Sequence, residues 1–306
     1  MHDRMFCLLG KGTKGGDYMN IGFIGAGKVG FSLGKYLKLN QHFLSGYYSQ
    51  NLSSSLKAAE FTDSKQFTNI KDLVGESDII FLTVPDSALA TISQEISQYP
   101  VAGKIFCHCS GAFNHEILSE LEAKGAFTFS VHPFLAISDK YTSYQDLSKA
   151  FFTIEGNLTN PLGLEKKEII EELIKSCHNS YQFIDSKDKV KYHTSAVFAS
   201  NLMIGLVDMA TNLLLDCGFS RENANQALSN ILESNLSSII NKGCENALTG
   251  PIERNDYKTV TSHLDCLSQK DSYIEAYKAL SKQLVLIASK KHPDRDYSIM
   301  NSLLDK

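Results

Sequence analysis

Residues 21–30 read Ile-Gly-Phe-Ile-Gly-Ala-Gly-Lys-Val-Gly, an apolar stretch that runs directly into the pattern Gly25-x-Gly27-x-x-Gly30 and then into an amphipathic helix. A strand before the glycines and a helix after them are the context that gives this pattern meaning. Gly25 can make the tight turn, Gly27 leaves no Cβ in the way of a pyrophosphate, and Gly30 lets the helix pack closely on its strand. The helix start offers free N–H groups and the positive end of its dipole to phosphates. We therefore expect a dinucleotide-binding turn rather than a structural glycine turn, formed by Gly25, Ala26, Gly27, Lys28, Val29 and Gly30.

The composition is that of an ordinary globular protein with room for two domains. The chain has 306 residues, of which 43% are hydrophobic and 21% are charged. A formal net charge of −4 and a scatter of lysines do not favour nucleic acid or a membrane surface as a partner. Polar residues interrupt every apolar run before it reaches the roughly 20 residues of a membrane span. We therefore expect a soluble, cytoplasmic protein.

Seven cysteines, an odd number, show neither the spacing of a disulfide scaffold nor that of a zinc site. Cys107-His108-Cys109 resembles a ligand cluster, but it lies in a predicted strand, where alternate side chains point to opposite faces. We interpret its cysteines as small core residues and expect no bound metal.

Residues 1–18 differ from the rest of the chain and carry no signal-peptide pattern. Residues 14–19, Lys-Gly-Gly-Asp-Tyr-Met, can be encoded by codons that contain a bacterial ribosome-binding sequence just before an ATG. We therefore interpret Met19 as the natural start and residues 1–18 as a non-native or disordered extension.

From Met19 onward, strand-like and helix-like segments alternate. Such alternation predicts an α/β fold with a doubly wound, mostly parallel Rossmann sheet. The expected strands are 19–24, 44–48, 78–84, 104–109, 126–131, 151–154 and 181–184, and the expected helices are 28–39, 52–60, 70–74, 86–97, 114–124 and 164–177.

After Asp185 no further strand pattern occurs, and helical periodicity takes over. We expect one long helix from about Val190 to Leu214, a second from Ser220, and two more at 256–268 and 271–291. The predicted organisation is a dinucleotide-binding domain at 19–185 and an all-helical substrate and dimerisation domain at 186–306.

In an open parallel sheet, ligands bind beyond the carboxyl ends of the strands. The second strand is followed by Ser49, Gln50 and Asn51, where an acidic residue would hold the ribose hydroxyls of NAD, and residues 43–59 contain no Asp or Glu. A carboxylate would repel a 2′-phosphate, so its absence favours NADP, although no arginine is present here to bind that phosphate. Gln50 stands in a suitable place.

Three other strand ends carry candidate residues. Val84, Pro85 and Asp86 would lie beside the cofactor, or Asp86 would simply cap the next helix. Ser110 introduces a hydroxyl near the expected nicotinamide position. His132, before a proline, lines the cleft or only covers the sheet.

The helical half contributes His193 and Asn201, which share one face of the predicted long helix. A polar stripe on an apolar helix needs partners, either in a ligand or in a neighbouring helix. Thr249 begins the turn Thr249-Gly250-Pro251 that interrupts the helical pattern. We expect His193 to act as proton donor or substrate anchor and Asn201 to orient the substrate, with Ser110 and Thr249 completing the pocket.

Six motifs together resemble one protein family. They are IGFIGAGKVG at 21–30, VPD at 84–86, HCSGA at 108–112, SVHPF at 130–134, KVKYHTSAVFASN at 189–201 and ALTGPIERND at 247–256. The chain resembles Rossmann-like proteins with a C-terminal helical domain of unknown function, a group named as NADP oxidoreductases and related to pyrroline-5-carboxylate reductase and the 6-phosphogluconate dehydrogenase superfamily. The resemblance implies NADP at Gly25–Gly30, a cleft between domains and a homodimer formed by the C-terminal helices.

The resemblance leaves the substrate and the acid open. One branch of the superfamily carries a catalytic lysine followed four residues later by asparagine, whereas Lys189 is followed four residues later by His193. We expect an NADP-dependent oxidoreductase that transfers a hydride to a small imine or carbonyl compound. The alternatives are a non-catalytic NADP-binding sensor and hydride exchange between NADP and a deazaflavin.

Overall fold

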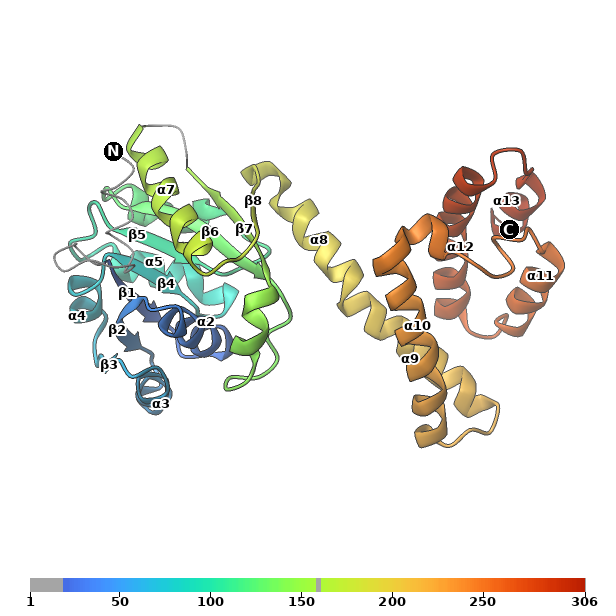
Figure 1. Ribbon diagram of the computed structural model, residues 1–306, viewed down its shortest axis with the longest axis horizontal. Helices are drawn as coiled ribbons and strands as arrows, with labels where there is room; N and C mark the ends of the chain where they lie inside the picture. Colours follow the sequence, from blue (N-terminus) through green and yellow to red (C-terminus); the bar gives the residue numbers. More distant parts are fainter. Residues whose placement is uncertain (1–18, 158–160, 306) are drawn as a thin grey trace. The chain divides into compact units, whose positions relative to one another are not determined.

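The structure is a computed structural model that describes residues 19–157 and 161–305. The chain divides into two compact units, the first ending at Ser200 and the second beginning at Asn201. The proposed extension at residues 1–18 lies outside the described residues. The first unit has the expected α/β architecture and the second is helical (Figure 1).

The first unit is built on an eight-stranded sheet in the order β3-β2-β1-β4-β5-β6-β7-β8. All neighbouring strands are parallel except β6 and β7, which are antiparallel. The doubly wound, mostly parallel sheet is therefore confirmed. The strands are β1 (Asn20–Ile24), β2 (Phe43–Tyr48), β3 (Lys65–Gln66), β4 (Ile79–Leu82), β5 (Ile105–His108), β6 (Phe127–Phe134), β7 (Phe151–Gly156) and β8 (Tyr181–Phe183).

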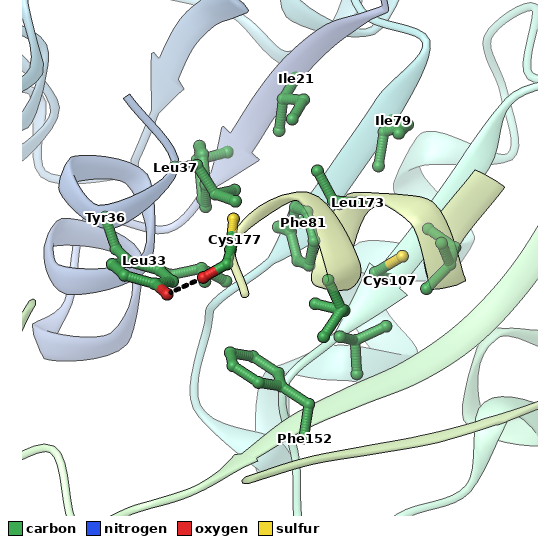
Figure 2. Close-up of a cluster of buried hydrophobic side chains, with 14 of the residues drawn as sticks. Ile21, Leu33, Tyr36, Leu37, Ile79, Phe81, Cys107, Phe152, Leu173 and Cys177 are labelled. Carbon is green, nitrogen blue, oxygen red and sulfur yellow. Dashed lines mark hydrogen bonds between the residues drawn. The ribbon is translucent and has the colours of Figure 1, made fainter. Parts of the chain in front are cut away.

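Helices cover both faces of this sheet, as the buried strands require. Successive side chains along a strand point to opposite faces of the sheet. In β4, Ile79 and Phe81 belong to one hydrophobic core, and Ile80 and Leu82 belong to the other. Figure 2 shows the first of these cores, in which Tyr36 donates a 2.9 Å hydrogen bond to the carbonyl of Cys177. One face carries α2 (Lys28–Leu39), α3 (Leu52–Thr62) and α7 (Pro161–Ser176), and the other carries α4 (Ile70–Gly75), α5 (Leu89–Ile96) and α6 (Ser119–Glu122).

Two predicted boundaries in the first unit are wrong. The sixth strand continues past residue 131, because β7 pairs with it as far as Phe134 opposite Phe151. His132 therefore lies within β6 and not after it. The helix expected at 114–124 is instead a 3₁₀ turn, η2 (His115–Leu118), followed by the short α6.

The single helix expected from Val190 to Leu214 is also wrong. Helix α8 (Lys189–Ala199) ends at Ser200, whose φ of −127° and ψ of −78° are not helical, and α9 (Asn201–Asp216) begins at the next residue. The Ser200 hydroxyl donates a 2.7 Å hydrogen bond to the carbonyl of Ala196, a contact that often accompanies a bent helix. Residues 193 and 201 therefore do not lie on one continuous helical stripe.

The second unit contains α9, α10 (Arg221–Ala247), α11 (Tyr257–Cys266), α12 (Asp271–Lys291) and α13 (Ser298–Asp305), the last of which the sequence analysis did not predict. Its core contains Val260, Val285, Ala288 and Met300. Ser220 caps α10 as expected, accepting a 3.1 Å hydrogen bond from the backbone N–H of Asn223. Gly243, with a φ of +73°, kinks α10 near its end.

Candidate active site

The three glycines after β1 have different surroundings. Gly25 has a φ of +108°, and a Cβ there would lie 2.6 Å from the carbonyl oxygen of Thr83. A Cβ at Gly30 would lie 2.5 Å from the carbonyl oxygen of Gly25. At Gly27 the nearest atom to a Cβ would be the carbonyl oxygen of Thr83 at 3.8 Å, an ordinary van der Waals distance, so this position has room for a further atom. The geometry fits a tight turn at Gly25, close packing at Gly30 and room for a ligand at Gly27.

A cavity of about 320 Å³ lies beside this turn. The predicted residues Gly25, Ala26, Gly27, Ser49, Gln50, Val84 and Pro85 line it, together with Ile24, Tyr48, Ser54, Thr83, Ala88, Ile92 and Lys140. Hydroxyl and amide groups from the end of β2 thus share one cavity with the glycine turn and the end of β4. This is the arrangement expected of a dinucleotide site in a sheet of this topology.

Five predicted cofactor residues do not line the cavity. Lys28, Val29 and Gly30 lie in the first turn of α2. Asn51 caps α3 by accepting a 3.2 Å hydrogen bond from the backbone N–H of Ser54. Asp86 lies in the 3₁₀ turn η1 (Asp86–Ala88) without capping it, and its carboxylate accepts a 2.9 Å hydrogen bond from the Ser110 hydroxyl.

A second polar cluster surrounds the turn after β5. The Ser110 hydroxyl donates to Asp86 and accepts hydrogen bonds from the backbone N–H groups of Ala112, at 3.1 Å, and Phe113, at 3.2 Å. Beneath it, His108 accepts from the backbone N–H of Ser110 at Nδ1. Burial lowers the pKa of His108 to about 4, so this imidazole is neutral at pH 7.

Two further imidazoles approach Gly111. A Cβ at this glycine would lie 2.7 Å from His193 Nδ1 and 3.0 Å from His132 Nε2. Tyr192 holds His132 through a 2.7 Å hydrogen bond between its hydroxyl and Nδ1. Burial, together with the nearby charge of Lys189, lowers the pKa of His132 to about 3. His193 therefore lies beside the glycine that follows Ser110 in the chain, and both are predicted site residues.

His193 Nδ1 is buried and has no hydrogen-bond partner among the residues that the structure describes. Leaving a buried polar atom without a partner costs free energy, so such an atom is a candidate for binding a ligand. The unpartnered Nδ1 atom of His193 is a property that the sequence alone does not reveal.

Lys189 is the functional candidate that the sequence analysis passed over. Its side chain is 1% exposed, and its ammonium donates a 2.6 Å hydrogen bond to the Ser130 hydroxyl. Burial lowers its pKa to about 8, against the opposing influence of Glu155, Cys109 and Asp86. Lys189 opens the motif at 189–201, and this motif is the sequence signal that could have identified it.

Asn201 and Thr249 belong to the second unit. Asn201 is the first residue of α9, and Thr249 follows α10 in the turn that contains Gly250, whose φ is +102°. Asp256, in the same segment, caps α11. The proposed roles of Asn201 and Thr249 in a substrate pocket stay predictions.

Two family models match separate parts of the chain. Residues 13–133 match the Rossmann-like domain, and residues 150–284 match the domain of unknown function DUF2520. No curated protein matches the sequence.

Solved structures with the same fold cover most of the chain at low sequence identity. Protein TM1727 of Thermotoga maritima is 22% identical, with a TM-score of 0.70 over 89% of this chain and 99% of its own. A putative NADP oxidoreductase of Bacteroides fragilis is 21% identical, with a TM-score of 0.67 over 87% of this chain and 98% of its own. A 1-pyrroline-5-carboxylate reductase of Streptococcus pyogenes is 15% identical, with a TM-score of 0.59 over 89% and 98%. By the two family models, the chain combines a Rossmann-like domain with a DUF2520 domain.

Proposed function

We propose that this protein is an NADP-dependent oxidoreductase that transfers a hydride to a C=N or C=O bond of a small molecule. The observation that carries the proposal is the room left at Gly27, which lines one cavity together with Ser49 and Gln50. Two of the similar structures are named as a putative NADP oxidoreductase and a 1-pyrroline-5-carboxylate reductase, and these names support the same reaction class.

The residues of the first unit would divide the work. Gly25 and Gly30 shape the turn, and Gly27 leaves room for the pyrophosphate next to the first turn of α2. When bound, the nicotinamide supplies the hydride. His193 Nδ1 would contact the substrate as proton donor or anchor, and Asn201 and Thr249 would complete the pocket. Lys189 would keep a buried positive charge near Gly111, where negative charge develops during reduction.

Binding of the cofactor is tested by thermal unfolding with NADPH and with NADH. A ligand at one hundred times its Kd stabilises a protein by roughly 2.7 kcal/mol, a shift of several degrees. We expect a larger shift with NADPH. Gly27→Ala should unfold at the wild-type temperature without ligand, because its Cβ meets no atom closer than 3.8 Å, but should lose the shift. Equal shifts would remove the preference for NADP, and no shift with either nucleotide would remove the site.

Catalysis is tested by following NADPH oxidation with a panel of cyclic imines, keto acids and a deazaflavin. With the compound that is reduced, His193→Ala should lower kcat/KM by about 10²–10⁴-fold, the usual contribution of a general acid. The adjacent exposed residue provides a control, since Thr194→Ala should leave the rate unchanged. A wild-type rate in His193→Ala would refute the assignment, and the absence of any turnover would favour the sensor.

The charge of Lys189 predicts a pH dependence of stability. Between pH 8 and 10.5 the unfolded chain keeps a proton that the folded chain has released, so the free energy of unfolding rises with pH. Relative to Lys189→Met, the wild type should gain about 3 kcal/mol across this range in urea unfolding. Lys191→Met removes an exposed charge from the same helix and serves as the control for a general effect of losing a lysine. A constant difference at all pH values would show that Lys189 is not held in a low-pKa environment.

We also propose that the protein is a cytoplasmic homodimer that associates through its C-terminal helices. The stretch Ser186–Asp216 is long and apolar enough to cross a membrane by length and composition, which the sequence analysis did not expect. However, exposed apolar side chains continue on α10, where their spacing forms one helical stripe. A group of exposed apolar side chains on two neighbouring helices is typical of a protein interface. It contains Leu202, Met203, Ile204 and Leu206 of α9, and Ile231, Leu232, Leu236, Ile239 and Ile240 of α10.

Light scattering after gel filtration tests the dimer. We expect a mass of twice 33.9 kDa without detergent. Ile240→Glu, at a side chain that is 73% exposed in the single chain, should give monomers because it places a charge in the apolar interface. Asn241→Glu adds the same charge at the neighbouring position and should leave the dimer intact. A monomeric wild type would contradict the proposal, as would a dimeric Ile240→Glu.

A further inference from the structure

A lysine side chain, Lys140, lines the cavity beside the glycine turn, although it does not come from the segment after β2. Residues 47–56, which end β2 and begin α3, include no lysine or arginine that could bind a 2′-phosphate. Among the described residues that line the cavity, Lys140 alone carries a full charge. It lies in the loop after β6, more than 80 residues beyond Gln50 in sequence, and the fold brings both to the same cavity.

The loop that carries Lys140 is held in a defined conformation. The neighbouring Asp139 carboxylate accepts hydrogen bonds from the backbone N–H groups of Tyr141, at 2.8 Å, and Thr142, at 2.9 Å, and from the Thr142 hydroxyl at 2.8 Å. The Ser32 hydroxyl of α2 donates to the carbonyl of Asp139 at 3.3 Å. Asp139 is therefore used to fold the loop, and the loop is fixed to the first helix.

Lys140 contacts α2 and the glycine turn without meeting a negative charge. Its ammonium donates a 3.2 Å hydrogen bond to the carbonyl of Ala26 and lies 4.9 Å from the centre of the Phe31 ring. No carboxylate forms an ion pair with it in the described part of the chain. An ammonium has three donors, so two remain for oxygen atoms of a ligand.

We propose that Lys140 binds the 2′-phosphate of NADPH and sets the preference for NADP over NAD. The inference rests on the proposed function. The pyrophosphate already has the room left at Gly27 and the N–H groups at the start of α2. The 2′-phosphate needs a cation close to the polar groups that follow β2. Lys140 shares its cavity with Ser49, Gln50 and Ser54, whose side chains can donate further hydrogen bonds to a phosphate.

The test is the Kd of NADPH and of NADH for Lys140→Gln, measured by titration calorimetry on the full chain. Loss of one charge-assisted hydrogen bond should weaken NADPH about tenfold or more and change NADH less than about threefold. Lys140→Arg keeps the charge and should retain most of the NADPH affinity. Lys57→Gln removes an exposed charge from α3, outside the cavity, and should bind both nucleotides like the wild type.

The outcomes separate this inference from the proposed function. An equal loss for NADPH and NADH would place Lys140 at the pyrophosphate and overturn the proposal, as would an unchanged NADPH affinity in Lys140→Gln. If the wild type binds neither nucleotide, the proposed function fails together with this inference. If Lys140→Gln is unstable, Lys140→Met, which keeps the length of the apolar stem, takes its place, and a folded Lys140→Met with wild-type NADPH affinity overturns the proposal.

Discussion

The close approach of α2 to the end of β4 is the constraint on which the first unit depends. Gly25 and Gly30 lie so near each other and Thr83 that a methyl group at either position would overlap backbone atoms. Hydrogen bonds hold the turn on both sides. Gly25 donates to the carbonyl of Tyr48 at 2.8 Å, and the Thr83 hydroxyl donates to the carbonyl of Gly25 at 2.8 Å. The ends of β1, β2 and β4 are thus fixed around one cavity, and the first turn of α2 begins at its wall.

A buried charge network fixes the start of α8 in a comparable way. Glu155 of β7 pairs with His115 and accepts a 2.5 Å hydrogen bond from Ser186, just before α8. Burial alone would lower the pKa of His115, but Glu155 raises it, and His115 and Ser186 lower the pKa of Glu155 against its own burial. Each group therefore favours the charged form of the other. Together with the Lys189 contact to Ser130, they hold the first turn of α8 on the sheet and so set the positions of Tyr192 and His193.

The sequence predicted the parts of the structure that depend on local chemistry. The glycine turn, most of the order of strands and helices, and the helix start at Ser220 follow from residues within one turn or one strand. The break at Ser200 was missed although the contact that accompanies it, from the Ser200 hydroxyl to the carbonyl of Ala196, is local. The extension of β6 was missed because its antiparallel partner β7 decides it. Lys140 was missed for a similar reason. Nothing in its neighbourhood in sequence indicates the cavity, and only the fold places it beside Ala26.

Lys189 supplies the positive charge beside two histidines, His108 and His132. Burial and the field of Lys189 keep His108 and His132 neutral at pH 7, since a second positive charge nearby would carry a desolvation cost of its own. Lys189, with a pKa of about 8, stays charged at neutral pH because Glu155, Cys109 and Asp86 favour its protonated form. A glycine at 111 is then the condition that lets His132 and His193 approach this charge. The result is a positive centre bordered by the neutral imidazoles of His108 and His132, an environment that would favour, in the proposed reaction, a substrate oxygen or nitrogen that gains electron density.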